Sequence, residues 1–135
     1  MEEFAAIVRQ MKSRHAVQVR RWRKKMSGCA WQVNYRDGRV NRWIEAPYPK
    51  TPISLAIFLH EVGHHAVGFD RHKRRCEEEY EVWKWAIDQM RALGIEPDQK
   101  VLRRFERSMQ YAVGKALRRG MKGLPEYLIQ FAPAA

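Results

Sequence analysis

Cysteine, acidic residues and long apolar runs are all scarce in this chain of 135 residues. Its two cysteines, Cys29 and Cys76, lack metal-ligand spacing and do not suggest a disulfide framework, so we expect a reducing, cytoplasmic compartment. No stretch has the length and apolarity of a signal peptide or a membrane span, and we expect no membrane partner.

The shortage of acidic residues leaves the chain strongly basic. Aspartate and glutamate number 15 against 26 lysines and arginines, which gives a formal net charge of +11 at pH 7. A charge of this size points to polyanionic or acidic partners, although a basic surface can also serve solubility alone. Hydrophobic residues make up 45% of the chain, which is enough for one domain with a single core.

The most informative motif is His60-Glu61-x-x-His64, in an otherwise apolar stretch. Residues four apart share one face of a helix, so His60 and His64 can bind one metal ion, and Glu61 is placed to meet a water on it. Zinc suits two imidazoles and a carboxylate with an open fourth position. A buried helix with two incidental histidines is the alternative, but these polar groups are costly on an apolar helix without a partner.

The helix that carries this motif has clear predicted ends. Thr51 can cap its first turn, Pro52 suits the first helical position, and the helix should end near Val67-Gly68. Glu61 is our predicted general base for peptide hydrolysis. His65, Tyr48 and Tyr80 are candidates for stabilising the oxyanion.

A second helix, predicted over residues 76–93, supplies a third ligand. Glu79 lies in phase with the apolar stripe of this helix, and a carboxylate there is costly unless a cation meets it. We therefore predict that Glu79 completes the metal site, with Glu78 as the fallback; an acidic first turn also favours the helix dipole without binding anything. His72, in the preceding basic loop, is a weaker candidate. The stripe in phase with Glu79 comprises Val82, Trp83, Ala86, Ile87 and Met90.

The N-terminal part is predicted to be a helix followed by a hairpin. Apolar residues recur at three- and four-residue steps over 2–26, which indicates one basic amphipathic helix that ends at Ser27-Gly28. Residues 30–46 alternate around Asp37-Gly38, which predicts an antiparallel hairpin with a two-residue turn. The hairpin can be purely structural, or its edge can bind an extended peptide by strand addition. The helical apolar face would comprise Phe4, Ile7, Val8, Met11, His15, Val19, Trp22 and Met26.

A long amphipathic helix is predicted over residues 97–119. Its basic face matches a surface that tracks phosphates, with Tyr111 as a stacking platform for a base, but a solvated helix face would look the same. The basic face comprises Lys100, Arg103, Arg104, Arg107, Lys115 and Arg118. The inward face would comprise Val101, Leu102, Phe105, Met109, Ala112, Val113, Ala116 and Leu117. The tail from Leu124 to Phe131 should dock as a short turn of helix.

Residues 30–93 resemble the small gluzincins, in particular ImmA/IrrE-type peptidases and minigluzincins. Their second motif, Glu-x-x-Ala-Asn/Asp-x-x-Ala, aligns with Glu79 and Ala86 but meets Val82 and Trp83 at its two middle positions. The Asn/Asp commonly supports a zinc-bound histidine, and Trp83 cannot replace it in this role. The resemblance implies zinc-dependent peptide hydrolysis by a cytoplasmic protein, with Glu79 as a zinc ligand. In ImmA/IrrE-type proteins the substrates are often DNA-bound repressors.

Together these patterns predict an α+β, minimal zincin-like domain that is mostly helical with a small antiparallel β-sheet. We expect a basic N-terminal helix over 1–28, a hairpin with the metal-binding helices over 29–93, and a basic helical extension over 94–135. The predicted function is zinc-dependent hydrolysis of a protein or peptide substrate, with DNA or RNA as a possible partner of the basic helices. The alternative is a nucleic-acid-binding protein whose zincin core is structural or weakly active.

Overall fold

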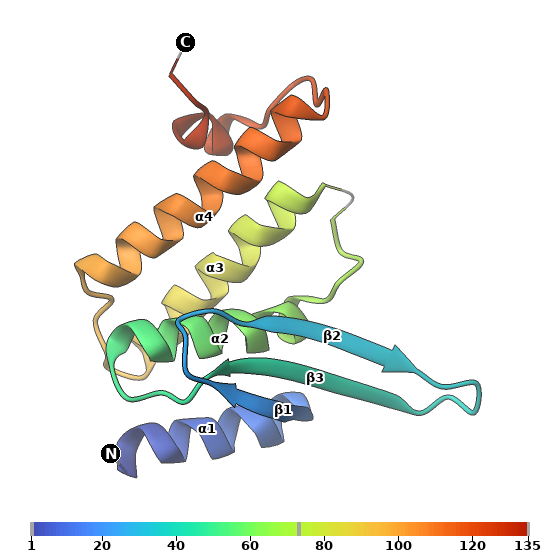
Figure 1. Cartoon of the computed structure of the whole chain (residues 1–135), viewed down its shortest axis with the longest axis vertical. Coiled ribbons are helices and arrows are strands. Elements are labelled where there is room, and N and C mark those ends of the chain that lie inside the picture. The colour runs from blue at the N-terminus through green and yellow to red at the C-terminus, as the bar shows by residue number, and fades with distance from the viewer. Residues whose placement is uncertain (1, 73, 135) are drawn as a thin grey trace.

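The computed structural model describes residues 2–72 and 74–134, in which helices pack against a small three-stranded sheet (Figure 1). None of the helices in this part of the chain is long and apolar enough to cross a membrane. The elements in chain order are α1 (Glu2–His15), β1 (Val17–Arg23), β2 (Cys29–Asn34), β3 (Val40–Pro47), α2 (Pro52–Val67), α3 (Arg75–Ala92), α4 (Gln99–Arg118) and the 3-10 helix η1 (Glu126–Phe131). The predicted α+β class with a small sheet is confirmed.

The sheet is mixed, so the prediction of a purely antiparallel sheet was wrong. Its strand order is β1-β3-β2, with β1 parallel and β2 antiparallel to the central strand β3. β2 therefore forms one edge of the sheet. α1 and α2 pack against the sheet, α3 packs on α2, and α4 on α3 (Figure 1).

The predicted helix over 2–26 was also wrong, because the helix ends at His15 and a strand follows. Ala16 has a positive φ of 53°, which breaks the helix, and Val17 begins β1. A bulge follows Val19, so that Arg20 and Arg21 both lie opposite Glu45. The bulge adds one residue between Val19 and Trp22, which both pack against the core. The resulting three-residue spacing mimics a helical period, which explains the error.

Glu45 joins β1 to β3 by charge as well as by backbone pairing. Its buried carboxylate accepts hydrogen bonds from Arg20 at 2.8 Å and Arg23 at 2.9 Å, with Arg21 at 3.9 Å. These hydrogen bonds hold the pKa of Glu45 below its ordinary value of 4.5. Three arginines predicted to lie on a helix are therefore gathered around one carboxylate.

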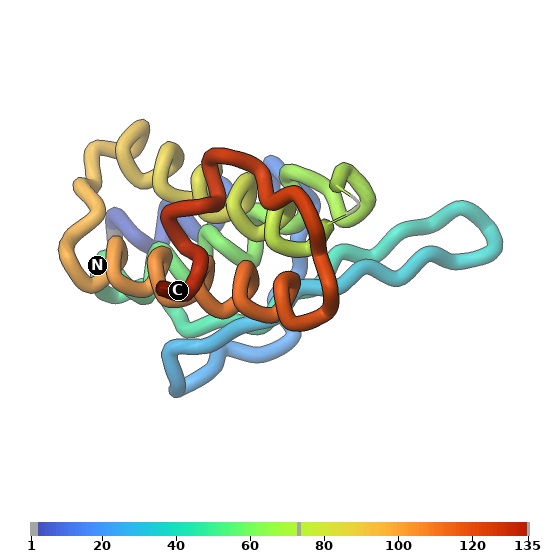
Figure 2. Tube along the Cα trace, turned by 90° about the horizontal axis from the view of Figure 1, so that it is seen from above, coloured from blue at the N-terminus to red at the C-terminus, as the bar shows by residue number. Residues whose placement is uncertain are grey.

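The β2–β3 hairpin projects away from the rest of the molecule in both views (Figures 1 and 2). Its turn differs from the predicted two-residue turn. The Tyr35 N–H donates to the Arg39 carbonyl and the Gly38 N–H donates to the Tyr35 carbonyl, so residues 36–38 form a three-residue loop. Gly38 occupies the position with positive φ, at 92°, which favours glycine in such loops.

Helix α2, which carries His60 and His64, and the C-terminal helices follow the predicted pattern closely. Thr51 caps α2 in a reciprocal arrangement with Ser54, and Pro52 is the first helical residue. α4 buries Val101, Met109 and Val113, whereas Leu102, predicted to face inward, is 43% exposed. The predicted terminal turn is η1, which packs Leu128 and Phe131 into the common core.

Candidate metal centre and the adjoining groove

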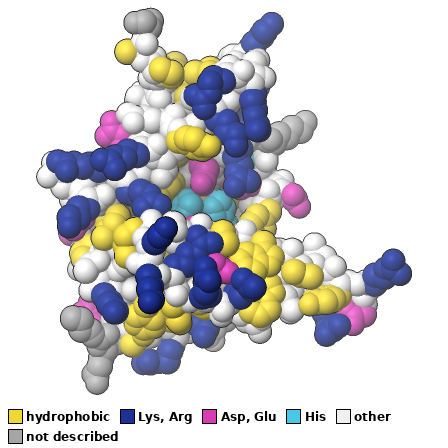
Figure 3. Space-filling model, in the orientation of Figure 1, with side chains coloured by type: hydrophobic (Ala, Val, Ile, Leu, Met, Phe, Trp, Pro, Cys, Tyr) yellow, Lys and Arg dark blue, Asp and Glu magenta, His cyan; other side chains and the backbone are white. Residues whose placement is uncertain are grey.

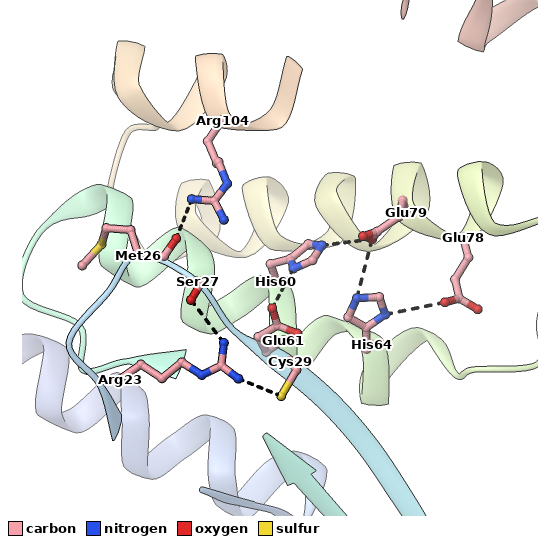
Figure 4. A network of polar contacts seen from close by, with 10 residues as sticks. All are labelled: Arg23, Met26, Ser27, Cys29, His60, Glu61, His64, Glu78, Glu79 and Arg104. Carbon is pink, nitrogen blue, oxygen red and sulfur yellow. Dashed lines mark hydrogen bonds and ion pairs between the residues drawn. The ribbon is translucent and has the colours of Figure 1, made fainter. Parts of the chain in front are cut away.

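His60, His64 and Glu79 converge on one point between α2 and α3. Three potential ligand atoms of these residues lie within 4.8 Å of one another. Glu79 Oε2 is 3.1 Å from His60 Nε2 and 3.6 Å from His64 Nε2 (Figure 4). The cluster could hold a metal ion, so the spacing of the motif and the helical phase of Glu79 led to the right three residues.

The donor set fits a divalent transition metal. Two imidazole nitrogens and one carboxylate oxygen are the protein ligands of one common type of catalytic zinc site, which leaves a fourth position open. All three side chains are largely buried, with exposed fractions of 11%, 7% and 17% for His60, His64 and Glu79. Two elements supply the site, because α2 presents both histidines from successive turns and α3 presents the carboxylate.

Glu78 and Trp83 support the two histidines from behind. Glu78 Oε2 lies 3.7 Å from His64 Nδ1, within ion-pairing reach but longer than a hydrogen bond (Figure 4). Trp83 packs its ring against His60, with centroids 4.5 Å apart and planes inclined by 33°. A buried carboxylate on the outer nitrogen of a ligating histidine orients the ring and raises its basicity. Glu78 thus offers one histidine the polar support that Trp83 cannot give.

The pKa values of the two histidines shift in opposite directions. Burial lowers the pKa of His60, but contacts with Glu61 and Glu79 outweigh it and raise this pKa to about 9. Burial lowers the pKa of His64 to about 4, and the charge of His60 adds to the effect. Burial raises the pKa of Glu79, yet the hydrogen bond from His60 prevails and leaves it lowered. At neutral pH Glu79 is therefore an ionised carboxylate able to bind a cation.

Glu61, the predicted base, is buried beside His60. Glu61 Oε2 lies 3.3 Å from His60 Nδ1, and Glu61 is 5% exposed to solvent. Gly28, in the loop from β1 to β2, passes directly over it. A Cβ at Gly28 would lie 2.8 Å from Glu61 Cγ and Oε2, and 2.6 Å from the Glu45 carbonyl oxygen. This close approach encloses the Glu61 carboxylate, and the glycine itself is the one feature of the sequence that points to it.

The metal ligands open into a pocket of about 490 Å³ whose wall is the edge strand β2. Cys29, Ala30, Trp31 and Gln32 of this strand line the pocket together with the three ligands and Glu61. Arg75 is the one lysine or arginine among its described lining residues. From the sequence we considered the hairpin edge as a binding site for an extended peptide, but we missed Arg75.

Several weaker candidates lie elsewhere. His72 contacts Glu81 at 2.6 Å, outside the metal cluster. The three side chains considered for the oxyanion do not line the pocket. His65 Nε2 contacts the Trp43 carbonyl oxygen at 3.0 Å, Tyr48 packs on Trp22, and Tyr80 packs among aromatic rings of α4 and η1. The structure therefore places all three outside the lining of this pocket.

The predicted basic face of α4 is divided. Arg104, Arg107, Tyr111 and Lys115 line a second, larger hollow of about 1120 Å³, which also reaches Glu79. Lys100, Arg103 and Arg118 belong to the same helix but do not line this hollow, which we call the basic groove. Its cationic lining residues are Arg74, Arg75, Arg104, Arg107, Lys115, Arg119 and Lys122.

Comparison of the chain with protein-family models, with curated proteins and with solved structures found no match in any of the three. Function has to be argued from the geometry of the metal centre and its surroundings.

Proposed function

We propose that the protein is a zinc-dependent metallopeptidase of the gluzincin type, which hydrolyses peptide bonds in a protein substrate in the cytoplasm. The observation that carries the proposal is the meeting of His60, His64 and Glu79 at the end of a pocket that also contains Glu61. Two histidines and a glutamate leave one coordination position open, which distinguishes catalytic from structural zinc sites.

In the proposed hydrolysis, each residue of the site has a separate role. Zinc, when bound by His60, His64 and Glu79, supplies a Lewis acid that acidifies water and polarises the scissile carbonyl. Glu61 takes the proton from the attacking water and gives it to the leaving amine nitrogen. Arg75, the cation of the pocket wall, replaces the earlier candidates for stabilising the negative charge that develops on the carbonyl oxygen.

Strand β2 supports a peptide as the substrate. It is an edge strand, so one row of its backbone N–H and C=O groups has no partner strand, and its residues 29–32 border the pocket. An extended peptide can add to such an edge by main-chain hydrogen bonds. The substrate backbone would then run past the metal ligands, with the scissile carbonyl near Glu61.

Metal content and a matched pair of variants test the proposal. Protein purified without added metal should carry about one zinc per chain, and Glu79→Ala should lose it because a ligand is missing. Glu61→Gln should keep the zinc and lose cleavage of a peptide mixture, since the amide cannot accept the proton. Asp88→Asn, on the exposed face of α3, is the control and should change neither. Retained cleavage by Glu61→Gln would refute the role of Glu61, and a protein that binds no zinc would refute the proposal.

A further inference from the structure

The basic groove has an unusual lining for a hollow beside a metal centre. Seven of its fourteen lining residues are arginine or lysine, and the one acidic residue among them is the metal ligand Glu79. We propose that this groove binds acidic side chains of the substrate, so that the protein acts on acidic segments of other proteins. The inference rests on the proposed peptidase function and names its substrate class.

The charges of the groove are available for a ligand. None of its seven cations forms an ion pair with another described residue, whereas the three arginines of β1 all surround Glu45. Arg104 is held in place by its hydrogen bond to the Met26 carbonyl oxygen at 2.8 Å, and Lys115 lies 5.9 Å above the Tyr111 ring. These contacts position the side chains without neutralising them, so the groove keeps a positive field that attracts carboxylates.

The groove continues into the metal-site pocket. Arg75 and Glu79 line both hollows, so a chain lying in the groove leads directly to the metal ligands. The space-filling view shows lysine and arginine side chains bordering the hollow in which the histidines are visible (Figure 3). A substrate bound at the metal would therefore extend into the groove on one side of its scissile bond.

The groove is long enough to read several substrate residues. Arg104 and Lys115 are eleven residues apart on α4, a distance of about 16 Å along a helix. An extended peptide advances about 3.3 Å per residue, so about five of its residues span this distance. Arg104, Arg107 and Lys115 place three cations along this length of α4, and such spacing suits a run of acidic residues better than a single one.

The lining favours a peptide over a nucleic acid. A surface that tracks phosphates would use all the cations of α4, yet Lys100, Arg103 and Arg118 lie outside the groove. The groove also ends at Glu79, where the proposed chemistry requires a peptide carbonyl. An acidic peptide fits both observations, and binding of a nucleic acid strand is the competing result that an experiment has to address.

Binding is measured first, on zinc-loaded Glu61→Gln protein so that hydrolysis plays no part. The probes are a fluorescein-labelled peptide containing a run of glutamates, the same peptide with glutamines, and a ten-nucleotide oligothymidylate. We expect the glutamate peptide to bind at least about tenfold more tightly than the glutamine peptide at 0.15 M salt, since several exposed charge pairs act together. The double variant with Arg107→Gln and Lys115→Gln, which we call the groove pair, should bind the glutamate peptide about tenfold more weakly.

The same helix offers a matched control that removes equal charge. Lys100→Gln with Arg103→Gln changes two exposed cations outside the groove and should leave binding of the glutamate peptide unchanged. Equal weakening by both pairs would mean unspecific attraction to a basic protein and would overturn the inference. Tighter binding of the oligothymidylate than of the glutamate peptide, weakened by the groove pair alone, would overturn it in favour of nucleic acid.

Cleavage separates this inference from the proposed function. Wild-type protein is incubated with a mixture of peptides, and the cleaved bonds are identified by mass spectrometry. Enrichment of aspartate and glutamate on one side of the cleaved bonds, lost in the groove pair but kept in the control pair, supports the inference. Cleavage without such enrichment refutes the inference and leaves the peptidase intact. Absence of cleavage with groove-specific binding refutes the peptidase and leaves a site for acidic peptides.

Discussion

Glu78 differs from its neighbour Glu79 by one position on α3, and the two carboxylates have different roles. Glu79 meets the Nε2 atoms of both histidines, whereas Glu78 lies behind His64, beside Nδ1. Burial raises the pKa of Glu78, because a buried carboxylate is unfavourable in its charged form unless a cation lies beside it. A helix can thus supply a ligand and its support from adjacent residues.

Replacing Glu78 tests this support. We expect Glu78→Gln to weaken zinc binding by about 10- to 100-fold, because His64 loses the carboxylate that orients its ring. Zinc affinity measured by competition with a chromophoric chelator gives the comparison, with Asp88→Asn as control. An unchanged affinity would show that His64 needs no such partner.

Gly28 offers a second test at the scale of one residue. A Cβ at this position would meet Glu61 and the Glu45 backbone at less than 3.0 Å, and both lie in packed surroundings. We expect Gly28→Ala to destabilise the fold by about 1 to 3 kcal/mol, as overpacking commonly does. Urea unfolding measures the free energy of unfolding of each variant. Gly123→Ala is not a suitable control, because the backbone at Gly123 has a positive φ that disfavours any side chain. Lys25→Ala, at an exposed position of the same loop, is the control, and equal stability of the two variants would contradict the prediction.

At the scale of elements, the attachment of β1 to β3 depends on ion pairs between arginines of β1 and Glu45. Glu45 binds arginines of β1 through a carboxylate that is ionised in the fold, and these bonds lower its pKa from 4.5. A group with a lowered pKa stabilises the fold above its unfolded pKa and loses that contribution as the pH falls. We therefore expect Glu45→Gln to unfold at a lower temperature than wild type at pH 7, and the difference to shrink below pH 4.5. Thermal unfolding at several pH values measures it; a difference independent of pH would contradict the mechanism.

The elements also show what could be predicted from the sequence. The period of 3.6 residues placed α3 and α4 correctly, and the motif spacing with Thr51 and Pro52 placed α2, because helical phase and capping are local properties. The bulge at Arg20 was not predictable in this way, since it depends on pairing with β3. The position of Glu78 beside His64 and the division of the α4 cations likewise follow from how helices pack, which no local pattern records.

At the scale of the whole molecule, the candidate metal centre joins α2 to α3. A metal bound to the folded state alone stabilises it by about 2.7 kcal/mol at a free concentration of 100 times Kd. For a chain of this size we expect zinc to raise Tm by about 5 to 10 °C, and a chelator to reverse the change. Differential scanning calorimetry with and without zinc measures it. His60→Ala should abolish the shift, and a shift that persists in this variant would place the metal elsewhere.

The projecting hairpin has a further consequence. Nothing lies within 4 Å of a Cβ built at Gly38, so the tip of the β2–β3 hairpin is free on all sides. Sequence changes, insertions or a fluorescent label at residues 36–39 would leave the core unaltered. One of its two strands, β2, runs back to line the candidate pocket, and β3 pairs with it. The hairpin tip therefore offers a place for a label that stands outside the core and belongs to the same strand, β2, that lines the candidate pocket.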